Sequence, residues 1–335
     1  MPQEKDKIRI SVAVITYNQQ ETIGQTLDSI LAQKGDFELE LVIGEDCSRD
    51  NTLAICKQYV EKHPNTIKLL SGPKNLGITA NYFRTLQACT GEYIGDIAGD
   101  DYYCDDHALE KQMRYLQSHP EVGVLGANGY RYYVRRGKRV IGENELVTKM
   151  NAKAFFFSPD YRGGVLIQGG GSMIRRELLN YIDYNEIIRR KLPVEDYPMQ
   201  AIWSQYTKFW RLDDPIVVYR VYKESATFIS FDHPKYLEYY KGLAETRRYL
   251  NELFPDDICF TEEQLQEQLF YKEFLLYVHQ LDYKRAKQLI ATLPDTLAKS
   301  EKVHHAKRFS HSWLYFVIFH LYKECIYIID LYKRT

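Results

Sequence analysis

The chain has 335 residues, of which 45% are hydrophobic and 27% charged, enough to bury a sizeable core in one large domain or two smaller ones. The formal net charge of −1 argues against a nucleic-acid partner. No stretch is long and apolar enough to span a bilayer, and the charged N-terminus lacks a signal-peptide core. Six scattered cysteines without a CxxC pair indicate reduced thiols in a cytosolic protein.

The first hundred residues alternate between strand and helix patterns. Compact apolar runs predict strands over residues 8–18, 39–46, 66–72 and 91–99. Amphipathic spacing predicts helices over residues 21–33, 48–65 and 79–90. This alternation predicts an α/β fold with a doubly wound, mostly parallel sheet and helices on both faces. Ligands of such sheets bind beyond the carboxyl ends of the strands, which places four loops on one rim: 16–21, 45–50, 72–77 and 99–106.

Residues 107–230 carry a mixed pattern. A helix is expected over residues 108–120, then two strands joined by a polar turn, over 122–134 and 137–145. Three further elements follow: a Gly-rich loop entering a helix (167–182), a second helix start (193–206) and a strand leading into a polar loop (213–227). The pattern is helical from residue 231 onward. The predicted organisation is therefore a first domain over 1–230, with halves 1–106 and 107–230, and a helical extension over 231–335.

Two polar loops follow the first two predicted strands, "TYN" at residues 16–18 and "GEDCSRDNT" at residues 44–52. At this rim Asp46 can accept hydrogen bonds from a base or a ribose, whereas Ser48 and Asp50 can cap the following helix. No GxGxxG follows the first strand, which weakens a dinucleotide-binding hypothesis. The absence of GxxxxGK[ST] excludes a P-loop.

The fourth predicted strand ends in an acidic stretch, "GDIAGDDYYCDD". Mg²⁺ usually takes one or two carboxylates together with substrate phosphates, so Asp100 and Asp101 suit a metal–diphosphate site. Asp96 cannot be a second ligand, because four strand residues span about 13 Å. Asp105 and Asp106 directly precede a helical pattern and are expected to cap that helix.

In their order and spacing, these motifs resemble the GT-A glycosyltransferases of family 2. The resemblance rests on the TYN, ED-x-S-x-D and N-x-G loops and on "GEYI…GDDYY". The nearest match is the C-E/D-G-D-D-Y-W subgroup of bacterial enzymes that build surface polysaccharides. Further on, "LPVEDYPM" resembles the family's ED motif, and "VVYRVYKESAT" resembles its YR-x-H-x-x-S-x-S segment. The resemblance covers about residues 8 to 230.

The resemblance implies a role for each matching residue. The residues that would bind the nucleotide part of the donor are Thr16, Tyr17, Asn18, Glu21, Asp46, Asn75 and Asp100. Asp100 and Asp101 would bind a divalent metal, Mg²⁺ or Mn²⁺. Asp196 would be the general base that deprotonates an acceptor hydroxyl, although Glu195 and Asp196 could also be an acidic pair that only favours a helix dipole. The residues near the acceptor or the donor sugar would be Gly170, Gly171, Ser172 and Glu195.

The implied function is inverting transfer of a sugar from a nucleoside diphosphate, with UDP favoured, to a hydroxyl of a glycan or lipid-linked acceptor. Two positions depart from the family pattern: Ala98 replaces the first Asp of D-x-D, and Tyr222 stands where a metal-binding His often completes the site. We therefore expect weak metal binding without the donor. One alternative is a non-catalytic nucleotide-sugar-binding protein with a degenerate metal site. Another is a sugar nucleotidyltransferase, but "TYNQQET" lacks the Gly-rich, Arg-containing loop of that class.

The C-terminal residues 311–335 are rich in aromatic and β-branched side chains and follow a basic segment, "KSEKVHHAKRF". On a helix, one side would carry His320, Lys323, Glu324, Tyr327 and Asp330. The other side would carry Ile318, Leu321, Cys325, Ile328 and Ile329. Two interpretations stay open: an interfacial helix on an anionic membrane, at the inner face of the plasma membrane, or a helix packed on the domain or on a second subunit of a homodimer.

Overall fold

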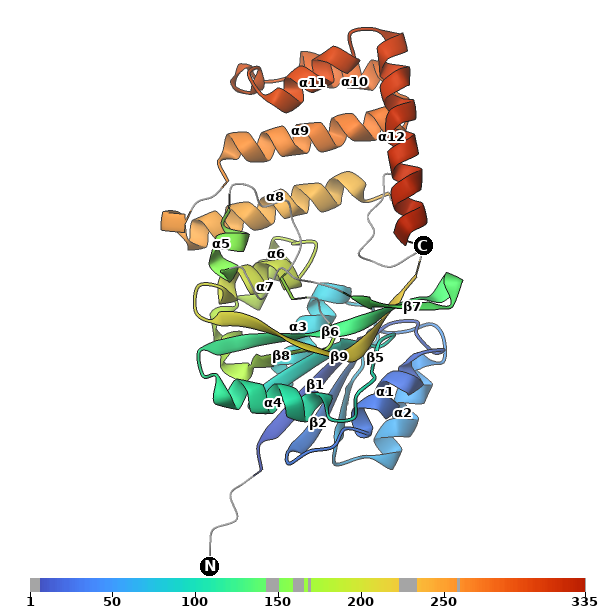
Figure 1. Cartoon of the computed structure of the whole chain (residues 1–335), viewed down its shortest axis with the longest axis vertical. Coiled ribbons are helices and arrows are strands. Elements are labelled where there is room, and N and C mark those ends of the chain that lie inside the picture. The colour runs from blue at the N-terminus through green and yellow to red at the C-terminus, as the bar shows by residue number, and fades with distance from the viewer. Residues whose placement is uncertain are drawn as a thin grey trace, which may run out of the picture. The chain divides into compact units, whose positions relative to one another are not determined.

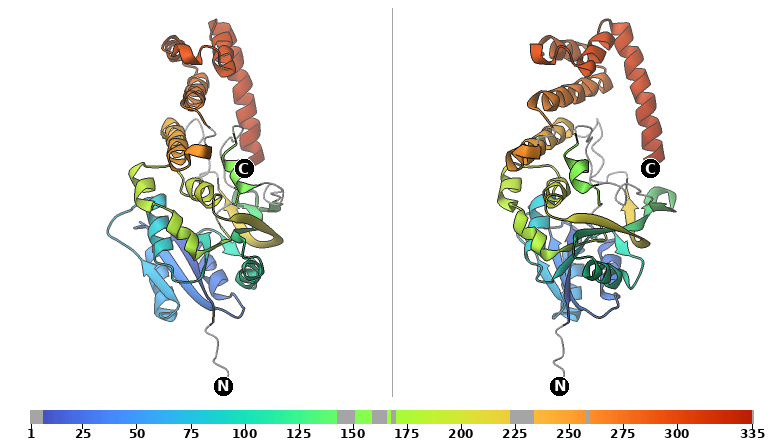
Figure 2. Two further views of the ribbon diagram at one scale, coloured as in Figure 1. Left: turned by 90° about the vertical axis from the view of Figure 1, so that its left-hand side faces the viewer. Right: turned by 60° about the vertical axis from the view of Figure 1, so that its left-hand side comes forward.

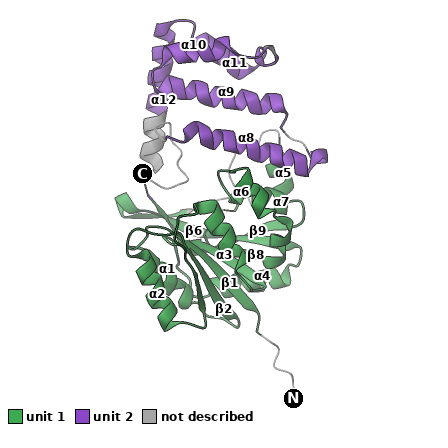
Figure 3. Cartoon of the chain, turned by 180° about the vertical axis from the view of Figure 1, so that it is seen from behind, with its two compact units in different colours: residues 1–221 green, residues 222–335 purple. Residues whose placement is uncertain are grey.

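The computed structural model describes residues 7–142, 151–158, 166–167, 170–222, 234–257 and 260–334. The chain divides into two compact units, residues 1–221 and residues 222–335 (Figure 3). The predicted polar loop after residue 222 and residues 168–169 of the predicted Gly-rich loop lie outside the described residues. Each unit is described by itself.

The first half of unit 1 is a parallel sheet with alternating helices (Figure 1). Its elements are β1 (Arg9–Thr16), α1 (Ile23–Leu31), β2 (Glu38–Glu45), α2 (Thr52–Lys62), β3 (Ile67–Leu70), α3 (Ile78–Gln87) and β4 (Tyr93–Ala98). The four strands pair in the order β3-β2-β1-β4, all parallel. The predicted doubly wound arrangement is therefore confirmed.

Helices cover both faces of this parallel sheet. On one face, Val12 of β1 and Ile43 of β2 share a core with Leu27 of α1, and full burial of such side chains contributes roughly 1.5–3 kcal/mol each. Successive strand residues point to opposite faces, so Gly44 points to the other face. There a Cβ on Gly44 would lie 2.0 Å from Thr85 Oγ1 of α3, and only glycine allows so close an approach.

The second half of unit 1 extends the sheet with mixed pairing. Its elements are β5 (Tyr102–Tyr103), α4 (Ala108–Ser118), β6 (Val122–Tyr133), η1 (Val134–Arg136), β7 (Lys138–Gly142), α5 (Ala152–Phe156), β8 (Ser172–Arg175), η2 (Arg176–Tyr181), α6 (Tyr184–Arg189), α7 (Asp196–Trp203) and β9 (Lys208–Val221). The order continues as β4-β8-β6-β9-β5, and β7 pairs with β6. Only β6 and β9 are parallel in this half.

One predicted element differs. The pattern at 167–182 predicts a loop entering a helix, but Ser172–Arg175 form β8, and a 3₁₀-helix follows. Gly170 and Gly171 have φ of 94° and 82°, which turns the chain into the space between β4 and β6. There β8 pairs on both edges, so tertiary pairing outweighs the local helix preference.

Unit 2 is helical in its described residues, as predicted. Its elements are α8 (Tyr236–Leu253), η3 (Pro255–Asp257), α9 (Glu262–His279), α10 (Tyr283–Ala291), η4 (Asp295–Leu297), α11 (Glu301–Phe309) and α12 (Trp313–Arg334). Within this unit α9 contacts each of the four other α-helices (Figures 1 and 2). Phe274 of α9 packs with Phe316 and Phe319 of α12 in one apolar core. No helix in the described residues is both long and apolar enough to cross a membrane.

Candidate active site

The register of three strands brings the predicted nucleotide loops to one rim. Thr16 pairs with Glu45 across β1 and β2, and Ile15 pairs with Ala98 across β1 and β4. The polar segments that follow these strands therefore begin side by side. Asn18 joins the loop after β1 to the loop after β2. Its backbone N donates to Ser48 Oγ at 2.9 Å, and its Oδ1 accepts from Arg49 N at 2.8 Å. Asn18 has φ of 53°, a left-handed value that asparagine tolerates.

Asp46 holds the loop after β3, residues 72–77, against the loop after β2. Its carboxylate is buried and accepts hydrogen bonds from the backbone N of Leu76 at 2.8 Å and of Gly77 at 2.9 Å. Asn75 Nδ2 donates back to Asp46 O at 2.9 Å. The two residues thus hold each other, and direct contact of either with a base or ribose stays a prediction. Asp50 accepts from the N and Oγ1 of Thr52, the first residue of α2, although the N-cap position itself is Asn51.

Unlike Asn18, Asp46 and Asn75, which make hydrogen bonds between loops, Tyr17 and Glu21 are exposed at the rim. The Tyr17 side chain is 39% exposed and Glu21 is also exposed, so both are accessible to a ligand at the rim. Thr16 is buried, and its Oγ1 donates to Gln19 Oε1 at 2.8 Å. The predicted nucleotide residues therefore form two groups, one that shapes the loops and one that is open to contact.

Asp100 and Asp101 stand at the end of β4 beside Arg220 of β9. The backbone N of Arg220 donates to Asp101 Oδ1 at 2.8 Å, and the guanidinium donates to Asp100 O and to Gln25 Oε1. Asp101 is only 1% exposed, and its Oδ2 has no hydrogen-bond partner among the described residues. Burial, together with the charge of Asp100, raises the pKa of Asp101 well above its ordinary value. Burial also raises the pKa of Asp100, although the charge of Arg220 opposes this.

These carboxylates fit a divalent metal only in company with phosphate. Within the described ranges, no cluster of three or more His, Cys, Asp or Glu side chains could hold a metal ion. Asp100 and the unpartnered Oδ2 of Asp101 supply hard oxygen donors, and Mg²⁺ and Mn²⁺ take their remaining ligands from phosphate and water. Ala98 adds no donor, and Tyr222 follows directly after β9 with only a phenol. The residues present therefore fit a metal that is shared with a diphosphate.

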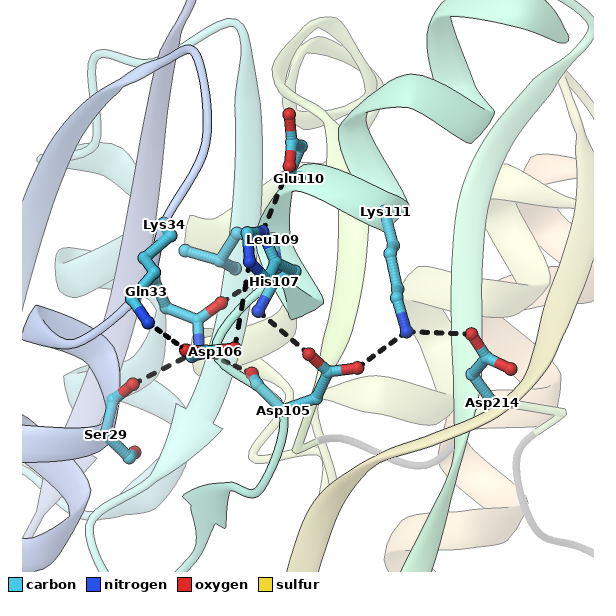
Figure 4. Close-up of polar contacts among 10 residues, drawn as sticks. All are labelled: Ser29, Gln33, Lys34, Asp105, Asp106, His107, Leu109, Glu110, Lys111 and Asp214. Atoms are coloured by element: carbon cyan, nitrogen blue, oxygen red, sulfur yellow. Dashed lines mark hydrogen bonds and ion pairs between the residues drawn. The ribbon is translucent and has the colours of Figure 1, made fainter.

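Asp105 and Asp106 lie near the start of α4 and make polar contacts there (Figure 4). Asp105 accepts from the backbone N of His107 at 2.8 Å and from Lys111 Nζ at 2.7 Å. Lys111 also reaches Asp214 at 3.0 Å. Asp106 bonds to Lys34 rather than to a helix N–H. The N-cap residue of α4 is His107, without a side-chain cap bond, so the expected capping by Asp105 and Asp106 is wrong. Asp105 instead bonds to the backbone N of that N-cap residue, and Asp106 joins the start of α4 to Lys34, which follows α1.

Asp196 opens α7, and Glu195 immediately precedes it. Asp196 borders a small cavity of about 30 Å³ that is also lined by Asp96, Ser172 and Tyr82. Burial raises the pKa of Asp196 to about 6, and the charge of Asp96 adds to the shift. Burial and the charge of Asp196 raise the pKa of Glu195 to about 7. A carboxylate with a pKa just below neutrality is suited to accept a proton near pH 7.

One short segment connects the two acidic centres. A Cβ on Gly170 would lie 3.2 Å from Asp101 Oδ2, so glycine leaves this oxygen open. Gly171 N donates to Asp96 O at 2.8 Å, and Ser172 Oγ donates to the Asp96 carboxylate. Residues 170–172 thus extend from Asp101 to the cavity of Asp196.

The sequence does not predict the contacts that three residues make at this site. It excludes Asp96 as a metal ligand and predicts no other role for it, although an acid in the middle of an apolar strand is itself a signal. Tyr82 carries no signal beyond its place on a helix. Arg220 belongs to the "YR" motif, but its bonds to Asp100 and Asp101 depend on the pairing of β5 with β9.

Residues 11–182, just over half of the chain, match the family model of glycosyl transferase family 2, and the chain belongs to that family. An uncharacterized protein of Mycobacterium tuberculosis is 38% identical over 115 residues, which is 34% of this chain and 33% of that protein. The minor teichoic acid biosynthesis protein GgaB of Bacillus subtilis is 23% identical over 219 residues, 65% of this chain and 23% of GgaB.

Among solved structures, S. aureus TarS 1–349 in complex with UDP matches with a TM-score of 0.55 at 18% sequence identity. The match covers 95% of this chain and 92% of the TarS chain. It confirms the GT-A fold expected from the sequence. The chain spans about a third of the length of the first curated relatives that it matches.

Asp46→Asn tests whether Asp46 holds the loops together. The amide keeps one acceptor and turns an N–H group toward a backbone N–H, so we expect a loss of about 1–3 kcal/mol in the free energy of unfolding. Urea denaturation without any ligand measures this. Asp36→Asn is the control, because the exposed Asp36–Lys7 ion pair should contribute less than about 1 kcal/mol. Unchanged stability of Asp46→Asn would contradict a structural role and leave ligand binding as the role of Asp46.

Proposed function

We propose that the chain is an inverting glycosyltransferase that moves a sugar from a nucleoside diphosphate, UDP in the first instance, to a hydroxyl of its acceptor. One observation carries the proposal: residues 170–172 join a buried carboxylate with an unpartnered oxygen, Asp101, to the cavity of a carboxylate with a pKa of about 6, Asp196. The first centre suits a metal-bound diphosphate and the second suits proton removal. The fold shared with the UDP complex of TarS supports a nucleotide donor.

In this proposal the nucleotide lies on the rim formed by the first three loops. Tyr17 and Glu21, which are exposed, contact the base and ribose. Thr16, Asn18, Asp46 and Asn75 give the pocket its shape through the hydrogen bonds between loops. Asp100 and Asp101 would hold Mg²⁺ or Mn²⁺ together with the diphosphate, and a bound metal would offset negative charge on the leaving group.

Asp196 performs the proton transfer. As the acceptor oxygen attacks the anomeric carbon, its proton passes to the Asp196 carboxylate, while the bond from that carbon to the diphosphate oxygen breaks. A single displacement of this kind inverts the anomeric configuration. With a pKa of about 6, Asp196 is mostly ionised at pH 7 and loses its basicity as the pH falls through 6. Gly170, Gly171, Ser172 and Glu195 border the space between the two centres.

We also propose the class of acceptor, a growing surface polysaccharide or its lipid-linked precursor. Two features support it: the Gly99–Tyr102 run, which resembles the subgroup of bacterial enzymes that build such polymers, and the partial match to GgaB. The rival hypothesis is a protein that binds nucleotide-sugars without transferring them. Binding of UDP-sugar with neither transfer nor donor hydrolysis in Mn²⁺ would favour that rival.

Asp196→Asn should lower the rate of transfer by about 10²- to 10⁴-fold, because the amide cannot accept the proton. Donor affinity should stay within a few-fold, because Asp196 does not face the diphosphate end. Transfer is measured by release of the nucleoside diphosphate, and donor binding by calorimetry. Asp183→Asn is the matched control: Asp183 also begins a helix, where its carboxylate accepts from Glu186 N at 2.9 Å, and asparagine caps equally well. Near-normal transfer by Asp196→Asn would refute the base assignment.

For α12 we propose contact with an anionic lipid surface at the inner face of the plasma membrane. The helix packs inward with Phe316 and Phe319 and also with polar groups: His320 Nδ1 lies 2.7 Å from Val278 O, and Glu324 pairs with His279. Its outward side is apolar. The exposed large side chains are Trp313, Leu314, Tyr315, Ile318, Leu321, Tyr322 and Ile326. The side chains of Tyr327, Ile328, Ile329 and Asp330 lie outside the described residues.

The charge beside this apolar side suits anionic lipid. Lys307 and Arg308 are exposed in the last turn of α11, directly before Trp313. Aromatic side chains flanked by basic ones are typical of interfacial helices, and each basic residue near an anionic surface contributes about 1 kcal/mol. A lipid-linked acceptor would make such docking useful.

Ile318→Glu combined with Leu321→Glu should abolish co-sedimentation with phosphatidylglycerol vesicles, because both side chains lie on the outward side of α12. Wild-type binding should weaken with salt and be absent on phosphatidylcholine alone. The control Leu253→Glu with Leu281→Glu makes the same charge change at exposed positions of the same unit. Equal vesicle binding by the α12 variant would contradict the proposal. Loss of a dimer in light scattering, without vesicle binding by the wild type, would assign the surface to a second copy.

A further inference from the structure

Asp96 is an acidic side chain in the interior of the sheet. It lies in β4, which pairs with β1 on one edge and with β8 on the other. Burying a charge there is costly unless hydrogen bonds offset it. Two hydroxyls do so: Tyr82 OH donates to Asp96 Oδ2 at 3.1 Å, and Ser172 Oγ donates to Asp96 Oδ1. The carboxylate is thus held in one orientation by α3 and β8.

Asp96 and Asp196 face one cavity. The cavity holds about 30 Å³, room for about one water molecule, and both carboxylates line it. The polar groups that face Asp196 are Asp96 from β4, Tyr82 from α3, Ser172 from β8, Gln200 from α7, and Glu195 just before α7. The residues lining this cavity, all within the described part of the chain, include no lysine or arginine. Among the residues that the structure describes, no cation in the cavity lining balances the two acids.

Gln200 and Tyr82 also line the cavity, but neither adds a charge beside Asp96 and Asp196. Gln200 is occupied by backbone groups, because its Oε1 accepts from Leu166 N and Ile167 N at 3.1 Å each. Burial, with the charge of Asp96 next, raises the pKa of Tyr82 well above its ordinary value, so the phenol stays a donor. Burial raises the pKa of Asp96, and the hydrogen bonds from Ser172 and Tyr82 oppose that rise, so Asp96 supplies the negative charge on the sheet side of the cavity.

We infer that Asp96 is a positioning residue that acts through Asp196, making Asp196 a stronger base for the acceptor proton. The inference rests on the transfer reaction proposed above. Two like charges across a small cavity repel, and a proton arriving on Asp196 removes that repulsion. The proton moves from the acceptor O–H to Asp196 during attack, so the repulsion favours the step in which the new C–O bond forms. Asp96 itself touches no reacting atom and exchanges no proton.

Asp96→Asn tests the inference, because asparagine keeps the shape and still accepts from Ser172. Without the charge of Asp96, the pKa of Asp196 should fall by about one unit, which moves the acid limb of the kcat/KM profile to lower pH by the same amount. The rate at neutral pH should drop several-fold, since a weaker base removes the proton less readily. Donor affinity should not change.

Tyr82→Phe is the control for a purely structural role. It removes one hydrogen bond to Asp96 but keeps the charge, so its acid limb should not move to lower pH. Thermal unfolding of both variants checks that they fold. If both variants lose the same activity with unmoved pH profiles, Asp96 acts only in packing and the inference is wrong.

A second readout does not need turnover. The Asp196 side chain can be followed by carbon NMR titration in the full chain, assigned with Asp196→Asn. Its midpoint should be lower in Asp96→Asn than in the wild type, and an equal midpoint would overturn the inference. The proposed function fails separately: it falls if the wild type transfers no sugar, or if Asp196→Asn remains active.

Discussion

The backbone N–H of Arg220 donates to a buried oxygen of Asp101, and the chemistry of the site depends on this contact. Residues 119 positions apart in the sequence meet there, one after β4 in the parallel half and the other in β9 of the mixed half. The contact satisfies one carboxylate oxygen, and no described residue donates to the other. An unsatisfied buried carboxylate is unfavourable without a ligand, and a cation that arrives with a diphosphate would relieve it.

The short Gly170–Ser172 segment turns two separate acidic centres into one site. Its positive φ values at Gly170 and Gly171 bring the chain past Asp101 and into the sheet beside Asp96. A side chain at either glycine would meet strain, and at Gly170 it would also approach Asp101 Oδ2. The segment therefore passes close to Asp101 at one end and holds the Asp96 carboxylate through Ser172 at the other. A donor sugar held between them would reach both.

Local patterns predict the parallel half well, because β1, β2 and β4 are buried apolar runs and α1 to α3 lie between them at regular spacing. They fail at β8, whose four residues become a strand only because β4 and β6 pair with both edges. The same limit applies to the site. Strand geometry correctly separates Asp96 from Asp100, but only packing brings Asp96 together with Tyr82, Ser172 and Asp196. For α12, periodicity defines two sides, but contact with α9 decides that His320 and Glu324 face inward.

We propose that Asp100 and Asp101 form a diphosphate site that a divalent metal completes. Calorimetric titration of UDP into the full chain, with and without Mn²⁺, tests this proposal. We expect that Mn²⁺ tightens UDP binding at least about tenfold, that UDP tightens Mn²⁺ binding by the same factor, and that Asp100→Asn removes this coupling in a folded protein. Equal UDP affinity with and without Mn²⁺, or full coupling in Asp100→Asn, would contradict it.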